Sequence, residues 1–136
     1  MRILIDTSFV VALINKNDEY HDLALQLSRE FNKVPTVITD SVLLEIGNSL
    51  AKNHKEDAIR TIERFFDADE VEIIKLDDDL FEKGFALYKE RLDKDWGLVD
   101  CISFVVMKER DITLALTHDR HFTQAGFRAM MREWVN

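Results

Sequence analysis

The sequence contains a single cysteine, Cys101, so no disulfide can form within the chain. Structural disulfides belong to oxidising compartments, and we therefore expect a cytoplasmic protein. The apolar run Phe9–Ile14, the longest near the start, is too short to cross a bilayer, which takes about 20 apolar residues. Asp6 interrupts the apolar residues that follow Arg2, so the sequence also predicts no signal peptide.

Helix-breaking residues are scarce, with one proline and four glycines. Helices should therefore dominate the fold. A length of 136 residues favours a single domain spanning residues 1–136. Hydrophobic residues make up 46% of the chain and charged residues 32%, enough for both a core and a solvated surface. That balance excludes a disordered or fibrous chain.

Basic residues are fewer than acidic ones, and the formal net charge is -8. Most nucleic-acid-binding proteins are basic, so this charge argues against a protein that binds polyanions broadly. Net charge governs long-range steering rather than the chemistry of one site, and an acidic surface also suits a basic protein partner.

Strand and helix patterns alternate along the chain. Short apolar runs predict buried strands at 2–5, 34–39, 71–76 and 113–116. Helical patterns cover 9–14, 20–31, a segment from Asp40 or Ser41 as the cap to about 53, 55–66, a segment from the Asp77–Asp79 cap to about 92, and 98–110. The tail, Phe127–Val135, is expected to add a short edge strand. Strands separated by helices predict a three-layer α/β/α sandwich with a central parallel sheet, whose ligands bind beyond the carboxyl ends of the strands.

Four acidic residues stand in apolar surroundings. Asp6 ends the strand Ile3–Ile5, Glu45 interrupts an apolar helical segment, Asp100 lies inside another, and Asp119 follows the last predicted strand. Burying an ionised carboxylate costs several kcal/mol unless a partner compensates it. Four such acids in one small domain therefore predict a shared cation.

The ligand type indicates which cation and which chemistry. Oxygen ligands without a histidine or cysteine cluster suit Mg²⁺ or Mn²⁺ rather than zinc. Several carboxylates can hold two such ions about 4 Å apart, an arrangement used for in-line hydrolysis of phosphodiesters. The acids thus predict metal-dependent phosphodiester hydrolysis.

Several stretches, in this order, resemble the PIN domain, and particularly the VapC group of toxin ribonucleases from toxin–antitoxin modules. The matching stretches are Ile3–Ser8, Val42–Ile46, Trp96–Phe104, Ala115–Phe122 and the tail Gln124–Phe127. Together they cover essentially the whole chain. The resemblance implies an α/β/α sandwich, an endoribonuclease acting on RNA, a homodimer and a cognate antitoxin protein that covers the site.

The resemblance also assigns roles to individual residues. Asp6, Glu45, Asp100 and Asp119 match the acids that bind Mg²⁺ or Mn²⁺ and carry catalysis. Thr7, Ser8 and Thr117 match hydroxyl positions that orient an acid or a bound water.

The hydroxyl residues could also have purely structural roles. Thr7 or Ser8 could cap the first helix, and Thr117 could be an ordinary strand-end residue. Ser103 shares a helical face with Asp100 and is a candidate to support the site, but it could also bond back to a carbonyl one turn earlier.

The polar residues around Asp119 receive less weight. Arg120 is the best of the scattered basic residues for contacting RNA phosphates. His118 and His121 are expected to be surface or structural residues rather than catalytic ones, and Asp18 an ordinary solvated or capping acid.

Other function classes fit the pattern less well. A phosphatase of the haloacid dehalogenase type needs a second acid two residues after the first, where this chain has Ser8. A response-regulator receiver requires an adjacent acidic pair after its first strand. A housekeeping PIN nuclease stays open, although small size favours the toxin. A non-catalytic PIN-like module is disfavoured by the intact set of four acids.

Overall fold

The computed structural model describes residues 1–134 and places the strands in one parallel sheet of order β3-β2-β1-β4-β5. The strands are β1 (Ile3–Ile5), β2 (Thr36–Thr39), β3 (Val71–Ile74), β4 (Leu114–Leu116) and β5 (Arg128–Ala129). The helices are α1 (Thr7–Ile14), α2 (His21–Glu30), α3 (Asp40–Ser49), α4 (Lys55–Asp67), α5 (Asp78–Glu90), α6 (Leu98–Glu109), α7 (Arg120–Gln124) and α8 (Met130–Glu133). The predicted sandwich with a central parallel sheet is confirmed.

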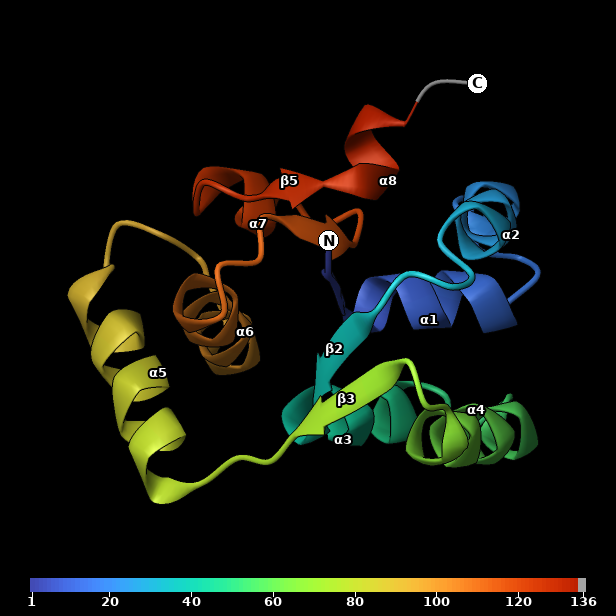
Figure 1. Cartoon of the computed structure of the whole chain (residues 1–136), viewed down its shortest axis with the longest axis horizontal. Helices are drawn as coiled ribbons and strands as arrows, with labels where there is room; N and C mark the ends of the chain where they lie inside the picture. Colours follow the sequence, from blue (N-terminus) through green and yellow to red (C-terminus); the bar gives the residue numbers. More distant parts are fainter. Residues whose placement is uncertain (135–136) are drawn as a thin grey trace.

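Helices cover both faces of the sheet because its strands are apolar on both sides. Successive side chains of a strand point to opposite faces. Ile3 and Ile5 of β1 belong to a buried cluster with α1, α2, α3, α4 and α8. Leu4 points the other way, into a second cluster formed mainly by α5, α6 and α7. Figure 1 shows α5 and α6 on one side of the molecule and α1, α3 and α4 on the other.

The middle of the sheet brings distant parts of the chain together. β1 lies between β2 and β4, with Ile5 in register with Leu116. The backbone N–H of Asp6 donates to the carbonyl of Leu116 at 3.2 Å, which continues the pairing past the strand end. Asp6 and Thr117 therefore meet at the carboxyl edge of the sheet.

Two predicted helix starts need correction. Helix α1 begins at Thr7 with Asp6 as its N-cap, and the side chain of Asp6 makes no capping bond. Helix α3 is capped by Thr39, whose hydroxyl accepts the N–H of Val42 at 3.2 Å, rather than by Asp40 or Ser41. Thr39 keeps the extended backbone of β2, which is the conformation that a capping residue needs. The predicted cap at Asp77 is confirmed.

The C-terminal part adds the predicted short edge strand and a helix that was not predicted. The edge strand is β5, which contains only Arg128–Ala129 and pairs with β4, and the chain then turns into α8. Met130 and Met131 bury their side chains against the α1 side of the sheet, which a straight edge strand would not allow. Val135 lies outside the described residues. Across residues 1–134, every helix is too short or too polar to traverse a bilayer.

A candidate metal centre at the carboxyl edge of the sheet

A cavity of about 360 Å³ opens where the carboxyl ends of β1 and β4 meet helices α1, α3 and α6. All four acids singled out in the sequence contribute to its wall, together with a fifth, Asp18. The lining residues are Asp6, Thr7, Ser8, Val11, Asp18, Glu45, Ser49, Asp100, His118 and Asp119.

Asp6 lies at the bottom of this group, with 6% of its surface exposed. The hydroxyl of Thr117 donates to its Oδ2 at 2.8 Å, and the hydroxyl of Ser8 lies 3.2 Å from the same oxygen. Burial raises the pKa of Asp6 to about 6, the bond from Thr117 opposes that rise, and the charge of Asp100 adds to it. Without a cation, this carboxylate is therefore costly to ionise.

The hydroxyls of Thr7 and Ser8 serve the cavity rather than the helix start. Thr7 donates to Oε1 of Glu45 at 2.7 Å, which fixes that side chain as it comes from the first turns of α3. Ser8 contacts Thr117 at 3.0 Å and accepts the backbone N–H of His118. The alternative that either residue caps α1 is wrong.

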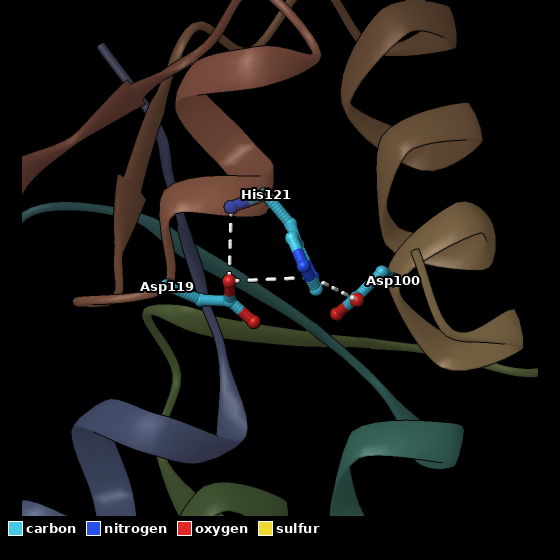
Figure 2. Close-up of side chains that lie close together, drawn as sticks. All are labelled: Asp100, Asp119 and His121. Atoms are coloured by element: carbon cyan, nitrogen blue, oxygen red, sulfur yellow. Dashed lines mark hydrogen bonds and ion pairs between the residues drawn. The ribbon is translucent and has the colours of Figure 1, made fainter. Parts of the chain in front are cut away.

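Asp100 and Asp119 face each other across the imidazole of His121 (Figure 2). The Nδ1 atom of His121 lies 3.0 Å from Oδ2 of Asp100 and 3.3 Å from Oδ1 of Asp119. The backbone N–H of Gly97 donates to the same oxygen of Asp100 at 3.1 Å. Burial is the main cause that raises the pKa of Asp100 above its ordinary value, and the bond with His121 counteracts it.

Three of the carboxylates share one feature: hydrogen-bond donors of the protein bind one oxygen of each carboxylate, and the other oxygen is unbonded in the described part of the chain. Hydrogen bonds engage Oε1 of Glu45, Oδ2 of Asp100 and Oδ1 of Asp119. Within residues 1–134, the second oxygen of each of these three carboxylates makes no hydrogen bond. Those oxygens are available to a ligand in the cavity.

The donor set fits a hard divalent cation. Across residues 1–134, no lysine or arginine pairs with any of the five acids that line the cavity. Asp100, Asp119 and His121 offer ligand atoms that all lie within 4.8 Å of one another. Uncompensated, partly buried carboxylates of this kind are suited to Mg²⁺ or Mn²⁺.

Sequence reasoning missed some residues of the cavity wall. Asp18 was expected to be a solvated or capping acid. Its Oδ1 accepts the N–H of Tyr20 at 2.9 Å just before α2, but the loop between α1 and α2 also brings Asp18 to the cavity wall. The ring of Tyr20 stacks on His118 with centroids 4.1 Å apart. The spacing of residues in the sequence does not predict which loop residues will lie at the cavity. His121 is outside the lining but contacts Asp100 and Asp119, and its position two residues after Asp119 was the only indication of this in the sequence.

Three predicted residues are not part of the cavity lining, and one of them, Thr117, lies behind it and is bonded to Asp6. Ser103 is fully buried in α6, and within residues 1–134 its hydroxyl has no hydrogen-bond partner, so the bond to a carbonyl one turn earlier is not formed either. Arg120 is exposed at the start of α7 and is not part of the lining. Instead, Arg132 donates to the carbonyl of His118 at 3.2 Å, which places a cation beside the rim.

This arrangement coincides with a known family. The model of the PIN domain matches residues 3–128. The chain is a PIN-domain protein. The PIN-domain match includes all four predicted acids and confirms the resemblance found in the sequence.

Relatives of this PIN-domain protein support the same assignment. The chain is 31% identical over 128 residues to the 23S rRNA-specific endonuclease VapC20 of Mycobacterium tuberculosis, a match that covers 92% of this chain and 95% of the relative. The crystal structure of VapC20, a toxin that cleaves the sarcin–ricin loop, matches with a TM-score of 0.84 and 28% identity. That match covers 93% of this chain and 96% of the solved chain. The expected kinship with the VapC toxins is confirmed.

Proposed function

We propose that this PIN-domain protein is a divalent-metal-dependent endoribonuclease that hydrolyses phosphodiester bonds in RNA and is the toxin of a toxin–antitoxin pair. One observation carries the proposal: carboxylates from β1, α3, α6 and the end of β4 converge on one cavity with no lysine or arginine paired to them within residues 1–134. The relationship to an endonuclease toxin supports it independently.

The residues that would hold the metal are Asp6, Glu45, Asp100 and Asp119, with Mg²⁺ or Mn²⁺ as the ion. When bound, such ions polarise the phosphodiester and make water a better nucleophile. The chain's own part is to fix the carboxylates before the substrate arrives. Thr7 and Thr117 do this for Glu45 and Asp6 through hydrogen bonds of 2.7 and 2.8 Å.

RNA must approach an acidic cavity, so cations at the rim matter. Arg132 contacts the backbone of His118, and Arg120 begins the helix that follows Asp119. We assign these two exposed side chains to phosphates of the RNA on either side of the scissile bond. Both can bind the backbone without reading its sequence, so they position rather than select the substrate.

The substrate class follows from the relatives. VapC20 acts on 23S rRNA and cleaves its sarcin–ricin loop, and the similarity spans nearly the whole of both chains. A structured ribosomal RNA loop is therefore the substrate that we propose for this chain. Recognition of RNA in loops relies on exposed bases, which a cavity between helices can accommodate.

We further propose a cytoplasmic homodimer that a cognate antitoxin inhibits. Exposed apolar side chains form two surfaces that suit protein partners. One lies on α3 and α4 and includes Leu44, Ile59 and Phe66. The other runs along α5 and into the residues that follow it; its members are Phe81, Phe85, Tyr88 and Leu92. The mass of the purified protein, alone and with the antitoxin, tests this part.

The nuclease proposal is tested by incubating the protein and its Asp6→Asn variant with ribosomal RNA, in Mg²⁺ and in chelator. We expect cleavage only by the unaltered protein with metal. Asp69→Asn, which neutralises an exposed aspartate outside the cavity, serves as the matched control and should cleave normally. Equal cleavage by Asp6→Asn would reveal a contaminating ribonuclease and remove the enzymatic assignment.

A further inference from the structure

His121 touches two of the acids at once. Its ring Nδ1 lies 3.0 Å from Asp100 and 3.3 Å from Asp119, and its backbone N–H donates to Oδ1 of Asp119 at 2.9 Å. Figure 2 shows the imidazole reaching from the first turn of α7 between the two carboxylates. Its side chain is only 20% exposed, so these contacts are sheltered from water.

We infer that His121 is a positioning residue that holds Asp100 and Asp119 as a pair, so that their free oxygens face one divalent cation. The inference rests on the proposed function, in which both acids bind metal. Because carboxylates only accept hydrogen bonds, the Nδ1 that contacts them carries a proton and acts as the donor. Donors of this kind fix the orientation of metal ligands.

The contacts argue against the Nδ1 atom of His121 as a direct ligand of the metal. The Nδ1 atom faces Oδ2 of Asp100 and Oδ1 of Asp119, and both oxygens already receive a second bond, from the backbone N–H of Gly97 and of His121 respectively. The other oxygen of each carboxylate is unbonded within residues 1–134 and is drawn without a dashed line in Figure 2. A protonated Nδ1 has no lone pair to offer an ion.

The neighbouring residue explains why His121 stays in place. Phe122 is fully buried and packs edge-on against Phe104 of α6, with ring centroids 4.9 Å apart. Phe122 therefore anchors α7 to α6, the helix that carries Asp100. His121, the residue before Phe122, contacts Asp100 of α6 from α7. Because the two helices are held at a fixed distance, the carboxylates of Asp100 and Asp119 are held at a fixed distance as well.

The test measures Mn²⁺ affinity by calorimetry for the unaltered protein and for His121→Ala and His121→Asn. Outer partners of metal ligands contribute about 10- to 100-fold in affinity, so His121→Ala should weaken binding by that factor. The amide N–H of asparagine can occupy the place of Nδ1, and His121→Asn should retain most of the affinity. His54→Ala, which removes a histidine that is not part of the cavity lining, should bind Mn²⁺ normally.

A second measurement separates positioning from ligation. Pulsed electron paramagnetic resonance of the Mn²⁺-loaded protein detects a nitrogen bound directly to the ion, and we expect none from His121. A direct nitrogen signal, lost in His121→Asn together with the affinity, would make His121 a ligand and overturn the inference. Unchanged affinity in His121→Ala would overturn it as well.

The same series distinguishes this inference from the proposed function. If the unaltered protein binds no Mn²⁺, both the proposed function and the inference about His121 are wrong. If the unaltered protein binds Mn²⁺ and cleaves RNA while His121→Ala does both equally well, only the inference fails. Thermal unfolding in chelator shows that each variant is folded before its affinity is compared.

Discussion

Among single residues, Asp6 is placed where its charge lowers the stability of the folded protein. Its carboxylate is buried among apolar strands, accepts hydrogen bonds from the hydroxyls of Ser8 and Thr117, and has no cationic partner within residues 1–134. Its pKa of about 6, against an ordinary value of 3.8, means that the folded chain holds a proton there more readily than the unfolded chain does. Above that pKa, the folded state contains an ionised group that the unfolded state would solvate better.

Without metal, this shift makes stability depend on pH. A raised pKa costs the folded state about 3 kcal/mol at pH values above 6, and the cost disappears as pH falls through 6 toward the unfolded value. We expect Asp6→Asn to be more stable than the unaltered protein at about pH 7.5 and to lose about half of that advantage near pH 5, where the folded state is mostly protonated at Asp6 and the unfolded state is not. Urea denaturation in chelator at both pH values measures the difference, and an advantage independent of pH would contradict the assignment.

Thr117 offers a second prediction, because its hydroxyl has three neighbours. It donates to Asp6, contacts Ser8, and accepts the backbone N–H of Asp119 at 3.0 Å. Thr117→Val keeps the volume but removes one of the two hydroxyl bonds to Asp6 and leaves the backbone N–H of Asp119 without its partner, so stability should fall by about 1–3 kcal/mol. Denaturant unfolding checks this value.

Thr36→Val is the matched control for that substitution. Thr36 is also a buried threonine of the central sheet, but its hydroxyl has no hydrogen-bond partner within residues 1–134. Removing an unsatisfied hydroxyl should leave stability unchanged or raise it. An equal loss in both variants would show that valine is poorly accommodated, rather than that the hydroxyl of Thr117 matters.

Sequence could identify Asp6, Glu45, Asp100 and Asp119 because acids inside apolar segments are costly and therefore conspicuous. It could not identify Asp18, since an acid in a polar loop looks like any other surface residue until the loop is folded over the cavity. The resemblance gave Thr7 the role of orienting an acid or a bound water, but spacing could not show that its partner is Glu45, 38 positions away. Such contacts depend on the fold rather than on spacing.

Among the elements, the α5–α6 pair depends on a glycine. Gly84 is buried where α5 crosses α6, and a Cβ atom there would lie 2.7 Å from Cγ1 and 3.4 Å from the Cα of Ile102. Cγ1 lies close to the backbone of a branched side chain and cannot move aside cheaply. Close approach of the two helices therefore requires the absence of a side chain.

Gly84→Ala should destabilise the protein even though alanine favours helices by about 1 kcal/mol over glycine. Overpacking typically costs about 1–3 kcal/mol, which exceeds that gain. Gly47→Ala, in α3 with nothing within 4 Å of the added Cβ, should instead stabilise the fold by up to about 1 kcal/mol. Thermal melts of the two variants should shift in opposite directions.

The strands and the longer helices followed from the sequence, and the two shortest helices, α7 and α8, did not. The amphipathic pattern of α4 was predicted nearly to its end, and the cap at Asp77 was found from its run of acids. Helix α7 escaped prediction because its five residues are too few to show a helical period. It depends on the burial of Phe122 and on the cap by Asp119, which accepts the N–H of His121.

For the whole molecule, metal binding should appear as stability. A ligand that binds only the folded state adds about 2.7 kcal/mol at a concentration 100 times its Kd. We expect Mn²⁺ to raise the melting temperature of the unaltered protein, and Asp6→Asn to show a much smaller rise. Chelator should reverse the effect. A rise of equal size in both proteins would place the ion elsewhere on this acidic chain.

The order of the strands has a consequence for how the protein is made. Because β1 lies against β4, the first carboxylate of the cavity meets the last only after more than a hundred intervening residues have been added. Parallel pairing over such separations forms late and slowly. A growing polypeptide whose β4 has not yet been translated therefore lacks both Thr117 and Asp119, so the acidic cavity at the sheet edge is assembled only after nearly the whole chain has been made.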